Sequence, residues 1–289
     1  MQTDIQIRDI HKLRTISHRL SKQIINITTK AGSGHPSSSL SMIDILTCLY
    51  FSGVMNYDPD NPGWKMRDRF ILSKGHGAPG LYVTLAEAGF FDPTLLTSLR
   101  QIGSPVEGHP NMKALPGVEA STGSLGQGLS IGVGHALAAR LDNQQYRVYV
   151  LIGDGEAEEG QIWEATMAAA KYRLENLTLI IDNNKFQQTA PVETVMPNLL
   201  PFVDKWRAFG WYAHEIDGHD LHAIISSFEM MKSVMDQPQV IIAHTKKGKG
   251  LSPFEENDTN RLHGKALTEE QAKVACAELD RKYQELKEE

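Results

Sequence analysis

The sequence predicts an α/β fold with a mostly parallel central sheet. The main evidence is a strand, helix, strand succession in mid-chain: apolar segments at 147–152 (RVYVLI) and 177–182 (LTLIID) flank a helical pattern at 161–172. A further apolar strand is expected at 240–243, and a glycine-bearing loop follows it, as one follows the strand at 147–152. Strands that alternate with helices in this way form βαβ units, whose strands run parallel.

The N-terminal region is expected to be largely helical. Between residues 5 and 30, apolar side chains recur at steps of three and four, which is typical of one buried helical stripe; they are Leu13, Ile16, Leu20, Ile24 and Ile27. This helix should end near Gly32 and Gly34, after which a loop presents His35. A second apolar helix is expected around 42–51. A turn-rich run at 58–63 and a short buried strand at 70–72 should follow it.

The C-terminal segment predicts a surface helix. Thr268 and Gln271 have the spacing of a capping box, and helical spacing relates the apolar residues that follow, which are Ala272, Ala275, Leu279, Tyr283 and Leu286. The sequence contains no internal repeat, no low-complexity tract and no long linker. We therefore expect one domain over residues 1–289.

Composition excludes several classes of protein. The 289 residues are 41% hydrophobic and 22% charged, and a net charge of −6 lacks the basic excess that nucleic-acid binding favours. Two cysteines, Cys48 and Cys276, are too few for a disulfide framework and fit a cytoplasmic protein. The N-terminus has no signal-peptide core, and glycines and polar residues interrupt the uncharged stretch at 120–139. We expect neither nucleic acid nor a membrane as a partner.

Polar residues follow two successive strands of the predicted sheet. Gly153-Asp154-Gly155 follows the first and Asp182-Asn183-Asn184 the second, so both should lie at the carboxyl edge, where open α/β sheets bind ligands. Asp154 offers a carboxylate and Asn184 an amide oxygen. Mg²⁺ prefers such donors, and so few of them are typical of a magnesium ion that phosphates also hold. Each motif alone could be a simple turn, but the pair predicts a metal-diphosphate site.

Other phosphate-binding and nucleophile motifs fail. Gly248-Lys249 and Gly264-Lys265 are not followed by Ser or Thr, which excludes a P-loop. The cluster at 126–131 has Ile131 where a dinucleotide-binding fingerprint needs a small residue. No Gly-x-Ser-x-Gly elbow occurs, so serine hydrolysis has no support.

Four of the eleven histidines lie beside glycine or proline, which indicates that loops present them: His35, His76, His109 and His263. An imidazole can donate to phosphate oxygens, orient sugar hydroxyls and move protons near neutral pH. The remaining histidines include four that we interpret as structural, namely His11, His18, His214 and His222.

Together these motifs resemble the N-terminal, diphosphate-binding part of transketolase over essentially the whole chain. Gly155 and Asn183 are separated by 27 residues, which matches the signature of thiamine-diphosphate enzymes. The matching segments, in order, are 33–36 (SGHP), 73–77 (SKGHG), 108–110 (GHP), 122–128 (TGSLGQG), 153–155 (GDG), 182–184 (DNN), 216–220 (IDGHD) and 263–264 (HG). Departures from the family pattern are Ser124 in place of a common proline and Lys185-Phe186 in place of Gly-Ile.

The resemblance implies a three-layer α/β/α fold that binds thiamine diphosphate and a divalent metal, Mg²⁺ or alternatively Ca²⁺ or Mn²⁺. Asp154, Asn184 and the main-chain carbonyl of Phe186 would hold the metal. His35, His109 and His263 would face the sugar. Cofactor contacts would come from His76, Gly123, Ser124, Leu125, Gly153, Asp154, Gly155, Glu159, Asn184 and His263, with Glu159 aligned to a glutamate at the family's subunit interface.

Transketolase chains normally continue into a second domain that supplies the pyrimidine-binding region and a catalytic glutamate, and this sequence ends before it. We therefore expect the N-terminal subunit of a two-component transketolase, which works with a separate C-terminal subunit in an α2β2 heterotetramer. Such an enzyme transfers a two-carbon ketol unit from a ketose phosphate to an aldose or aldose phosphate.

Three alternatives stay open from the sequence. One is a ketol transferase specialised for an unusual sugar phosphate, and another is a 1-deoxyxylulose-phosphate-synthase-like enzyme. The third is a non-catalytic module that only binds thiamine diphosphate. The Gly108-His109-Pro110 motif and His263 favour transketolase over the α subunit of a 2-oxoacid dehydrogenase.

Overall fold

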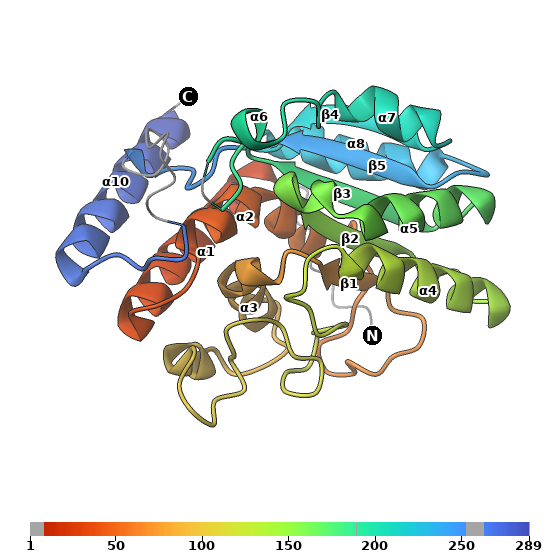
Figure 1. The fold of residues 1–289 in the computed structure, drawn as a ribbon. Coiled ribbons are helices and arrows are strands. Elements are labelled where there is room, and N and C mark those ends of the chain that lie inside the picture. The colour runs from red at the N-terminus through yellow and green to blue at the C-terminus, as the bar shows by residue number, and fades with distance from the viewer. Residues whose placement is uncertain (1–8, 189, 253–262, 289) are drawn as a thin grey trace.

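A computed structural model describes residues 9–188, 190–252 and 263–288, and it contains one five-stranded sheet (Figure 1). The strands are β1 (Arg69–Leu72), β2 (Val148–Gly153), β3 (Leu177–Asn183), β4 (Tyr212–Asp217) and β5 (Gln239–His244). Their order is β1-β2-β3-β5-β4, and every neighbouring pair is parallel. The predicted α/β class with a parallel sheet is confirmed.

Helices cover both faces of the sheet. They are α1 (Ile10–Ala31), α2 (Pro36–Phe51), α3 (Ala78–Glu87), α4 (Gln127–Leu141), α5 (Gly160–Lys171), α6 (Val192–Val195), α7 (Phe202–Ala208), α8 (Leu221–Ser233) and α10 (Glu269–Glu288), with 3-10 turns η1 (Gly75–Gly77), η2 (Pro93–Ser98) and η3 (Gly155–Glu158). Strand side chains alternate between two buried clusters. Tyr149 and Leu151 pack with α1, α2, α3 and α8, whereas Val150 and Ile152 pack with α4, α5 and α7. The predicted three layers are therefore present.

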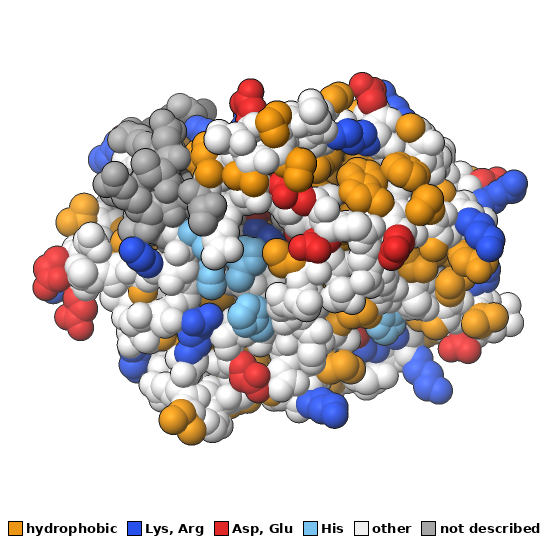
Figure 2. Space-filling model, viewed as in Figure 1, with side chains coloured by type: hydrophobic (Ala, Val, Ile, Leu, Met, Phe, Trp, Pro, Cys, Tyr) orange, Lys and Arg blue, Asp and Glu red, His pale blue; other side chains and the backbone are white. Residues whose placement is uncertain are grey.

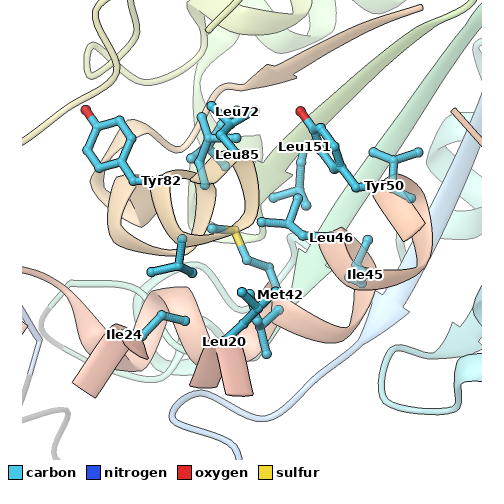
Figure 3. Packing of buried hydrophobic residues seen from close by; sticks show 14 of the residues in the cluster. Leu20, Ile24, Met42, Ile45, Leu46, Tyr50, Leu72, Tyr82, Leu85 and Leu151 are labelled. Atoms are coloured by element: carbon cyan, nitrogen blue, oxygen red, sulfur yellow. The ribbon is translucent and has the colours of Figure 1, made fainter. Parts of the chain in front are cut away.

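The first cluster is built around α2 (Figure 3). Leu46 and Tyr50 of α2 lie beside Leu72 and Leu151 of the sheet, and Met42 lies between α1 and α3. Helix α2 is buried along its whole length, which explains why its sequence is apolar without a polar face. Because both faces of the sheet are covered, its central strands read as nearly continuous apolar runs.

The predicted N-terminal helix is α1, and its expected residues 5–8 lie outside the described part of the chain. Asp9 caps it by accepting from the His11 amide, and Gly32 ends it with φ 59°. The second helix begins at Pro36, earlier than predicted, so His35 is its N-cap and not the middle of a loop. Proline is well suited to a first helical turn because that turn needs no amide donor.

The C-terminal capping box is confirmed. The Thr268 amide donates to Gln271 Oε1 (3.0 Å), and the Gln271 amide donates to Thr268 Oγ1 (3.2 Å). Helix α10 then lies along α1, on the side away from the sheet (Figure 1). Tyr283 of α10 stacks on the His18 ring with centroids 4.3 Å apart, so His18 has the structural role expected from the sequence.

Helix α4 was not predicted, because its glycines and alanines form no amphipathic stripe. The glycines instead permit close packing on the sheet: a Cβ at Gly132 would lie 2.5 Å from Val150 Cγ2, and one at Gly128 would lie 2.4 Å from Ser73 Cβ. The packing outweighs the cost of about 1 kcal/mol that an interior helical glycine carries. None of the helices in the described ranges is long and apolar enough to cross a bilayer.

The packing of α4 gives a stability prediction. Gly132→Ala should destabilise the fold by about 1–3 kcal/mol, because its new methyl group would overlap Val150 on the sheet. Gly134→Ala is the matched control on the same helix, since a Cβ there meets nothing within 4 Å. It should stabilise the fold by up to about 1 kcal/mol. Urea unfolding of both variants is the measurement, and shifts of equal sign and size would contradict the packing argument.

Candidate functional site

The two polar motifs lie side by side at the carboxyl edge of the sheet. Gly153 of β2 pairs with Asp182 of β3, so Asp154 and Asn184 leave adjacent strand ends. Strand β3 extends through Asn183, one residue beyond its expected end at residue 182. Pairing with β5 continues through His244 and holds Asn183 in the ladder. Asp154 and Asn184 are 2% and 7% exposed.

Asp154 is a buried carboxylate with only amide donors around it. It accepts from the amides of Gly155 (2.8 Å) and Lys185 (2.5 Å), and none of the described ion pairs includes it. Burial, assisted by the negative charge of Asp182, raises the pKa of Asp154 to about 7. Asn184 Oδ1 accepts from the Phe186 amide (3.1 Å). Among the described residues the carboxylate has no cation in direct contact, and a divalent ion would supply one.

A complete metal shell is not present in the described ranges, where no three His, Cys, Asp or Glu side chains cluster in a metal-binding arrangement. An ion held by Asp154 and Asn184 would need further oxygens. The Phe186 carbonyl and a diphosphate are of the right chemical kind, because Mg²⁺ commonly combines few protein ligands with phosphate oxygens.

A buried ion pair lies directly behind these residues. Lys74 Nζ contacts the Asp182 carboxylate and donates to the Ser38 carbonyl (2.9 Å), and the two charged side chains are 1% and 0% exposed. Asp182 also accepts from Ser41 and Thr245. Burial raises the pKa of Asp182, but the positive charge of Lys74 and the hydrogen bonds from Lys74, Ser41 and Thr245 together outweigh burial, so the pKa is lowered. Sequence reasoning quoted Lys74 within a motif but gave it no role.

Three of the four loop histidines form a triangle. The ring centroids are 5.2 Å apart for His35 and His76, 5.0 Å for His35 and His263, and 5.6 Å for His76 and His263. Figure 2 shows histidines gathered in a hollow near the centre of one face, with Lys or Arg side chains beside it. His35 Nδ1 is buried and has no hydrogen-bond partner among the described residues.

The triangle is uncharged at neutral pH. Burial, and then the positive charges of Arg100 and other nearby cations, lower the pKa of His35 to about 4. Burial and Lys247 lower the pKa of His263 to about 3, and burial places the pKa of His76 well below its usual value. Each neutral ring offers one donor and one acceptor nitrogen to a ligand.

His109 lies apart from the triangle, against the segment expected to line the thiamine. A Cβ at Gly123 would lie 3.1 Å from His109 Cδ2, so the absent side chain makes room for the imidazole. The backbone of Gly75 in η1 also lies close to Gly123, since a Cβ added at Gly75 would lie 2.8 Å from the Gly123 amide nitrogen. Thus Gly123 brings the His109 loop and the His76 turn together. Leu125 beside it is half-buried.

Two predicted cofactor residues, Ser124 and Glu159, are exposed in the described chain. They lie on either side of the turn at Gly126. A Cβ added at Gly126 would lie 2.8 Å from Glu159 Cβ. Exposure suits residues that meet another subunit, and the assignment of both to the cofactor or the interface stays a prediction.

Glu156 is a buried carboxylate that sequence reasoning did not assign. It accepts from the Ser73 hydroxyl, from the Gly126 amide (2.9 Å) and from the Gly153 amide (3.1 Å). Ser73, Gly126 and Gly153 belong to three different segments of the site, so their hydrogen bonds to Glu156 hold these segments together. No sequence signal distinguished it from Glu158, which is half-buried, or from Glu159, which is exposed.

Lys247 is the other functional residue that the sequence did not reveal. It is 7% exposed, and its Nζ lies 3.1 Å from His263 Nδ1. Burial lowers the pKa of Lys247 to about 8, opposed by the negative charge of Asp154. The one sequence feature that could have indicated Lys247 is its place in the glycine-bearing loop after β5. We considered that loop only as a possible P-loop.

A buried network anchors the loop that carries Lys247. Lys249 donates to Asp44 Oδ2 (2.5 Å), and His219 Nδ1 donates to the same oxygen (2.8 Å). His219 Nε2 accepts from the Lys246 amide (2.9 Å). The Ile216–Asp220 motif, which the sequence left without a role, therefore helps to position this loop.

Comparison with protein families supports this arrangement. The transketolase, thiamine diphosphate binding domain model matches residues 14–285. The chain belongs to this family. The resemblance predicted from the ordered motifs is confirmed.

Two transketolase-family relatives match nearly end to end. The chain is 46% identical to the 6-deoxy-6-sulfo-D-fructose transketolase subunit SqwG of Clostridium sp. over 87% of this chain and 90% of that protein. It is 41% identical to an apulose-4-phosphate transketolase subunit of Phocaeicola vulgatus over 97% of this chain and 98% of that protein. Human transketolase is 40% identical, but the chain covers only 42% of it.

Solved transketolase structures share the fold. The Leishmania mexicana enzyme superposes with a TM-score of 0.85 at 30% identity, over 94% of this chain and 41% of that one. The Campylobacter jejuni enzyme gives 0.84 at 32% identity, over 97% and 43%. The predicted thiamine-diphosphate-binding fold is therefore confirmed.

We expect the affinity of the chain for magnesium pyrophosphate to depend on pH. Magnesium pyrophosphate serves here as a probe for the position of the diphosphate. Lys247 loses its proton as pH rises through about 8, so the affinity of the wild-type chain should fall above that pH. Lys247→Arg should keep its affinity to pH 9, because a guanidinium stays charged. Lys247→Met should bind about tenfold more weakly at pH 7, which is ~1.4 kcal/mol.

Isothermal titration calorimetry between pH 7 and 9 measures these affinities. Lys246→Met is the control, because Lys246 is the exposed neighbour of Lys247 and should bind as the wild type does. The same pH profile in the wild type and in Lys247→Arg would contradict a role for the ammonium group.

Proposed function

We propose that this chain is the diphosphate-binding subunit of a two-component transketolase, a transferase that moves a two-carbon ketol unit from a ketose phosphate to an aldose or aldose phosphate. One observation carries the proposal: a triangle of neutral histidines lies with Lys247 next to two buried oxygen donors at adjacent strand ends. The full-length match to relatives named as transketolase subunits supports it.

The residues present fit thiamine diphosphate and a divalent metal. Asp154, Asn184 and the Phe186 carbonyl would hold Mg²⁺, or Ca²⁺ or Mn²⁺ in its place. Lys247, His76 and His263 would bind the diphosphate, and the backbone of Gly155 would contact it. The absent side chain of Gly155 makes room for Gln187, because a Cβ there would meet Gln187 Cβ at 2.7 Å. The Nδ1 of His35 is buried and has no hydrogen-bond partner within the described ranges, so it is a further group that a ligand could engage. When bound, thiamine diphosphate supplies the carbon nucleophile that cleaves the bond next to the ketose carbonyl.

The histidines of this chain act on the sugar. His35 and His263 line the hollow as neutral rings, so each can accept a hydrogen bond from one hydroxyl and donate to another oxygen. His109 is exposed and uncrowded, and its ring can take or return the proton of a substrate hydroxyl while the carbon–carbon bond breaks or forms. A positioned acid–base group of this kind contributes about 10²–10⁴-fold in rate.

The partner is a separate C-terminal subunit that supplies the pyrimidine-binding region and the catalytic glutamate, in an α2β2 heterotetramer. The exposed Ser124 and Glu159 would meet a neighbouring subunit, and the word "subunit" in the names of the two relatives supports a divided enzyme. Cytoplasmic location and the single domain over residues 1–289 stay predictions.

The donor is proposed to be a ketose with an anionic end-group. The names of the two relatives specify a sulfo sugar and a sugar phosphate, so a donor outside the pentose phosphates is a specific alternative. Neither a 1-deoxyxylulose-phosphate-synthase-like enzyme nor a purely cofactor-binding module would form ketol-transfer products in the following assay, so such products exclude both.

The decisive test is ketol transfer from xylulose 5-phosphate to ribose 5-phosphate, with thiamine diphosphate and Mg²⁺. The chain alone should be inactive, and co-expression with its C-terminal subunit should give activity. Asp154→Ala should abolish metal-dependent retention of the cofactor while the circular dichroism spectrum is unchanged. Activity of the lone chain would overturn the divided site, and full activity of Asp154→Ala would overturn the metal assignment.

His109→Ala should lower kcat by about 10²-fold or more in the two-subunit complex, because it removes an acid–base group at the substrate. The Kd for thiamine diphosphate should stay within about twofold. His222→Ala is the control, since His222 is an exposed histidine at the start of α8. Equal rates for the two variants would remove His109 from the reaction.

A further inference from the structure

A second cavity lies at the carboxyl edge of the sheet, between helices α1, α8 and α10 and the ends of β4 and β5. We call it the β4–β5 cavity. Its volume of about 900 Å³ is within the range of about 300–1,000 Å³ that is usual for ligand pockets. Its described lining contains none of the four loop histidines and neither Asp154 nor Asn184. It is therefore separate from the metal-diphosphate site.

The loop after β5 contributes to both sites. Lys246 and Lys249 line the β4–β5 cavity, and Lys246 is exposed. Lys247, which directly follows Lys246, does not line the cavity; it is buried, with its Nζ 3.1 Å from His263 Nδ1. Successive lysines thus belong to two different sites, which makes the two sites separable by mutation.

Cations outnumber carboxylates in this cavity, although the whole chain has a net charge of −6. Its described lining has more basic than acidic side chains: Arg14, Lys185, Lys246, Lys249 and Lys282 against Asp44, Asp217 and Asp220. Lys249 pairs with Asp44, and Lys282 pairs with Glu278 of α10. None of the ion pairs within the described ranges includes Arg14, Lys185 or Lys246.

Main-chain amides hold the two remaining carboxylates of the cavity. Asp217 accepts from the His219 amide (2.8 Å), and Asp220 caps α8 by accepting from two amides of its first turn. Arg14 donates from Nη1 to the Leu286 carbonyl (3.1 Å), which leaves other guanidinium N–H groups for a ligand. Three cations of the cavity thus have no carboxylate partner in the described part of the chain, and an anionic ligand would supply one.

Lys185 adopts a backbone conformation that favours glycine. Its φ is 67°, in the left-handed region, where a side chain is unfavourable. Glycine, which the family pattern has at this position, would supply the same amide that donates to Asp154. The lysine therefore adds only its side chain, which lines the β4–β5 cavity. Because backbone strain is concentrated at functional sites, this observation points to a ligand independently of the charge count.

Apolar side chains form another part of the lining. Ile43, Leu221 and Leu279 are buried in the wall, and Tyr283 stacks on the His18 ring. A ligand that uses the whole cavity would combine an anionic group with an apolar, ring-shaped body. A phosphate monoester carries a charge of about −1.5 to −2 at pH 7, more than the single charge of a carboxylate, so three unpaired cations favour a phosphate.

We propose that the β4–β5 cavity is a second binding site, which takes an organic phosphate with an apolar ring. Its phosphate contacts Arg14, Lys185 and Lys246, and its ring lies on the apolar wall. The site is additional to the proposed function, because the cofactor would lie at Asp154 and Asn184 and the sugar at the loop histidines.

Adenosine 5′-monophosphate is a suitable probe, because it joins one phosphate to a flat ring system. It is titrated by calorimetry into the full chain saturated with thiamine diphosphate and Mg²⁺, so that the diphosphate site is filled. The probe should bind, whereas adenosine and inorganic phosphate should each bind at least about tenfold more weakly, since each lacks one part of the contacts. No binding of the probe, or equal affinities for the probe and either fragment, would overturn the proposal.

The two adjacent lysines give a crossed comparison. Lys246→Met should weaken binding of the probe by about tenfold, because it removes a charged donor, and should leave the affinity for magnesium pyrophosphate unchanged. Lys247→Met should have the reverse effect. Weaker binding of the probe in Lys247→Met, with wild-type affinity in Lys246→Met, would place the probe in the diphosphate site and overturn the proposal.

Lys185→Gly separates ligand binding from folding. Glycine adopts φ 67° without strain, so the midpoint of urea unfolding should not fall. The affinity for the probe should nevertheless drop by about tenfold, because one cation is lost. Lys273→Met is the surface control, since Lys273 is exposed on α10 and lies outside the described lining. Equal affinities of Lys185→Gly and Lys273→Met for the probe would overturn the assignment of the cavity cations to the phosphate.

Discussion

The buried pair of Lys74 and Asp182 is the interaction on which the site depends. Lys74 belongs to the turn that leads to His76, and Asp182 lies two residues before Asn184. Their hydrogen bonds to Ser38, Ser41 and Thr245 add the start of α2 and the loop after β5. Buried charges are stable only when paired and fully hydrogen-bonded, so these four segments share one arrangement. His35, His76, Asn184 and Lys247 are carried by segments that this pair joins.

Electrostatics explains why the same site suits an anionic group. Lys74 and Lys247 are buried behind the histidines, and their positive charges help to keep the rings neutral. Asp154 is the opposite case, because burial and Asp182 disfavour its negative charge. A divalent ion bound with a diphosphate would satisfy both kinds of group, since the ion would compensate the Asp154 carboxylate and the phosphates would compensate Lys247, whereas Lys74 is already paired with Asp182. The charge distribution of the hollow is therefore complementary to a metal-diphosphate unit.

Sequence reasoning identified the parts of the fold that have strong local signals. Apolar runs predicted β2, β3 and β5, and the spacing of Thr268 and Gln271 predicted the start of α10. It missed β4, an edge strand whose exposed polar residues interrupt the apolar pattern, and α4, whose glycines conceal a helix. In the site, the loop histidines were visible because glycine or proline flanks them, and Asp154 and Asn184 were visible because they follow predicted strands. Lys247, Lys74 and Glu156 were not, because burial of a charged side chain is a tertiary property.

The positions of the site residues along the chain also bear on the order in which the molecule assembles. Asp154 and Asn184 each follow a strand of one βαβ unit, so bringing them together closes a much shorter loop than bringing His35 and His263 together. His35 and His263 come from opposite ends of the chain, and their rings meet only after a long loop closes. During synthesis on the ribosome, the oxygen donors would thus be in place while the imidazole triangle is still incomplete. Affinity for a phosphorylated cofactor would consequently mature only when the last segment of the chain has emerged.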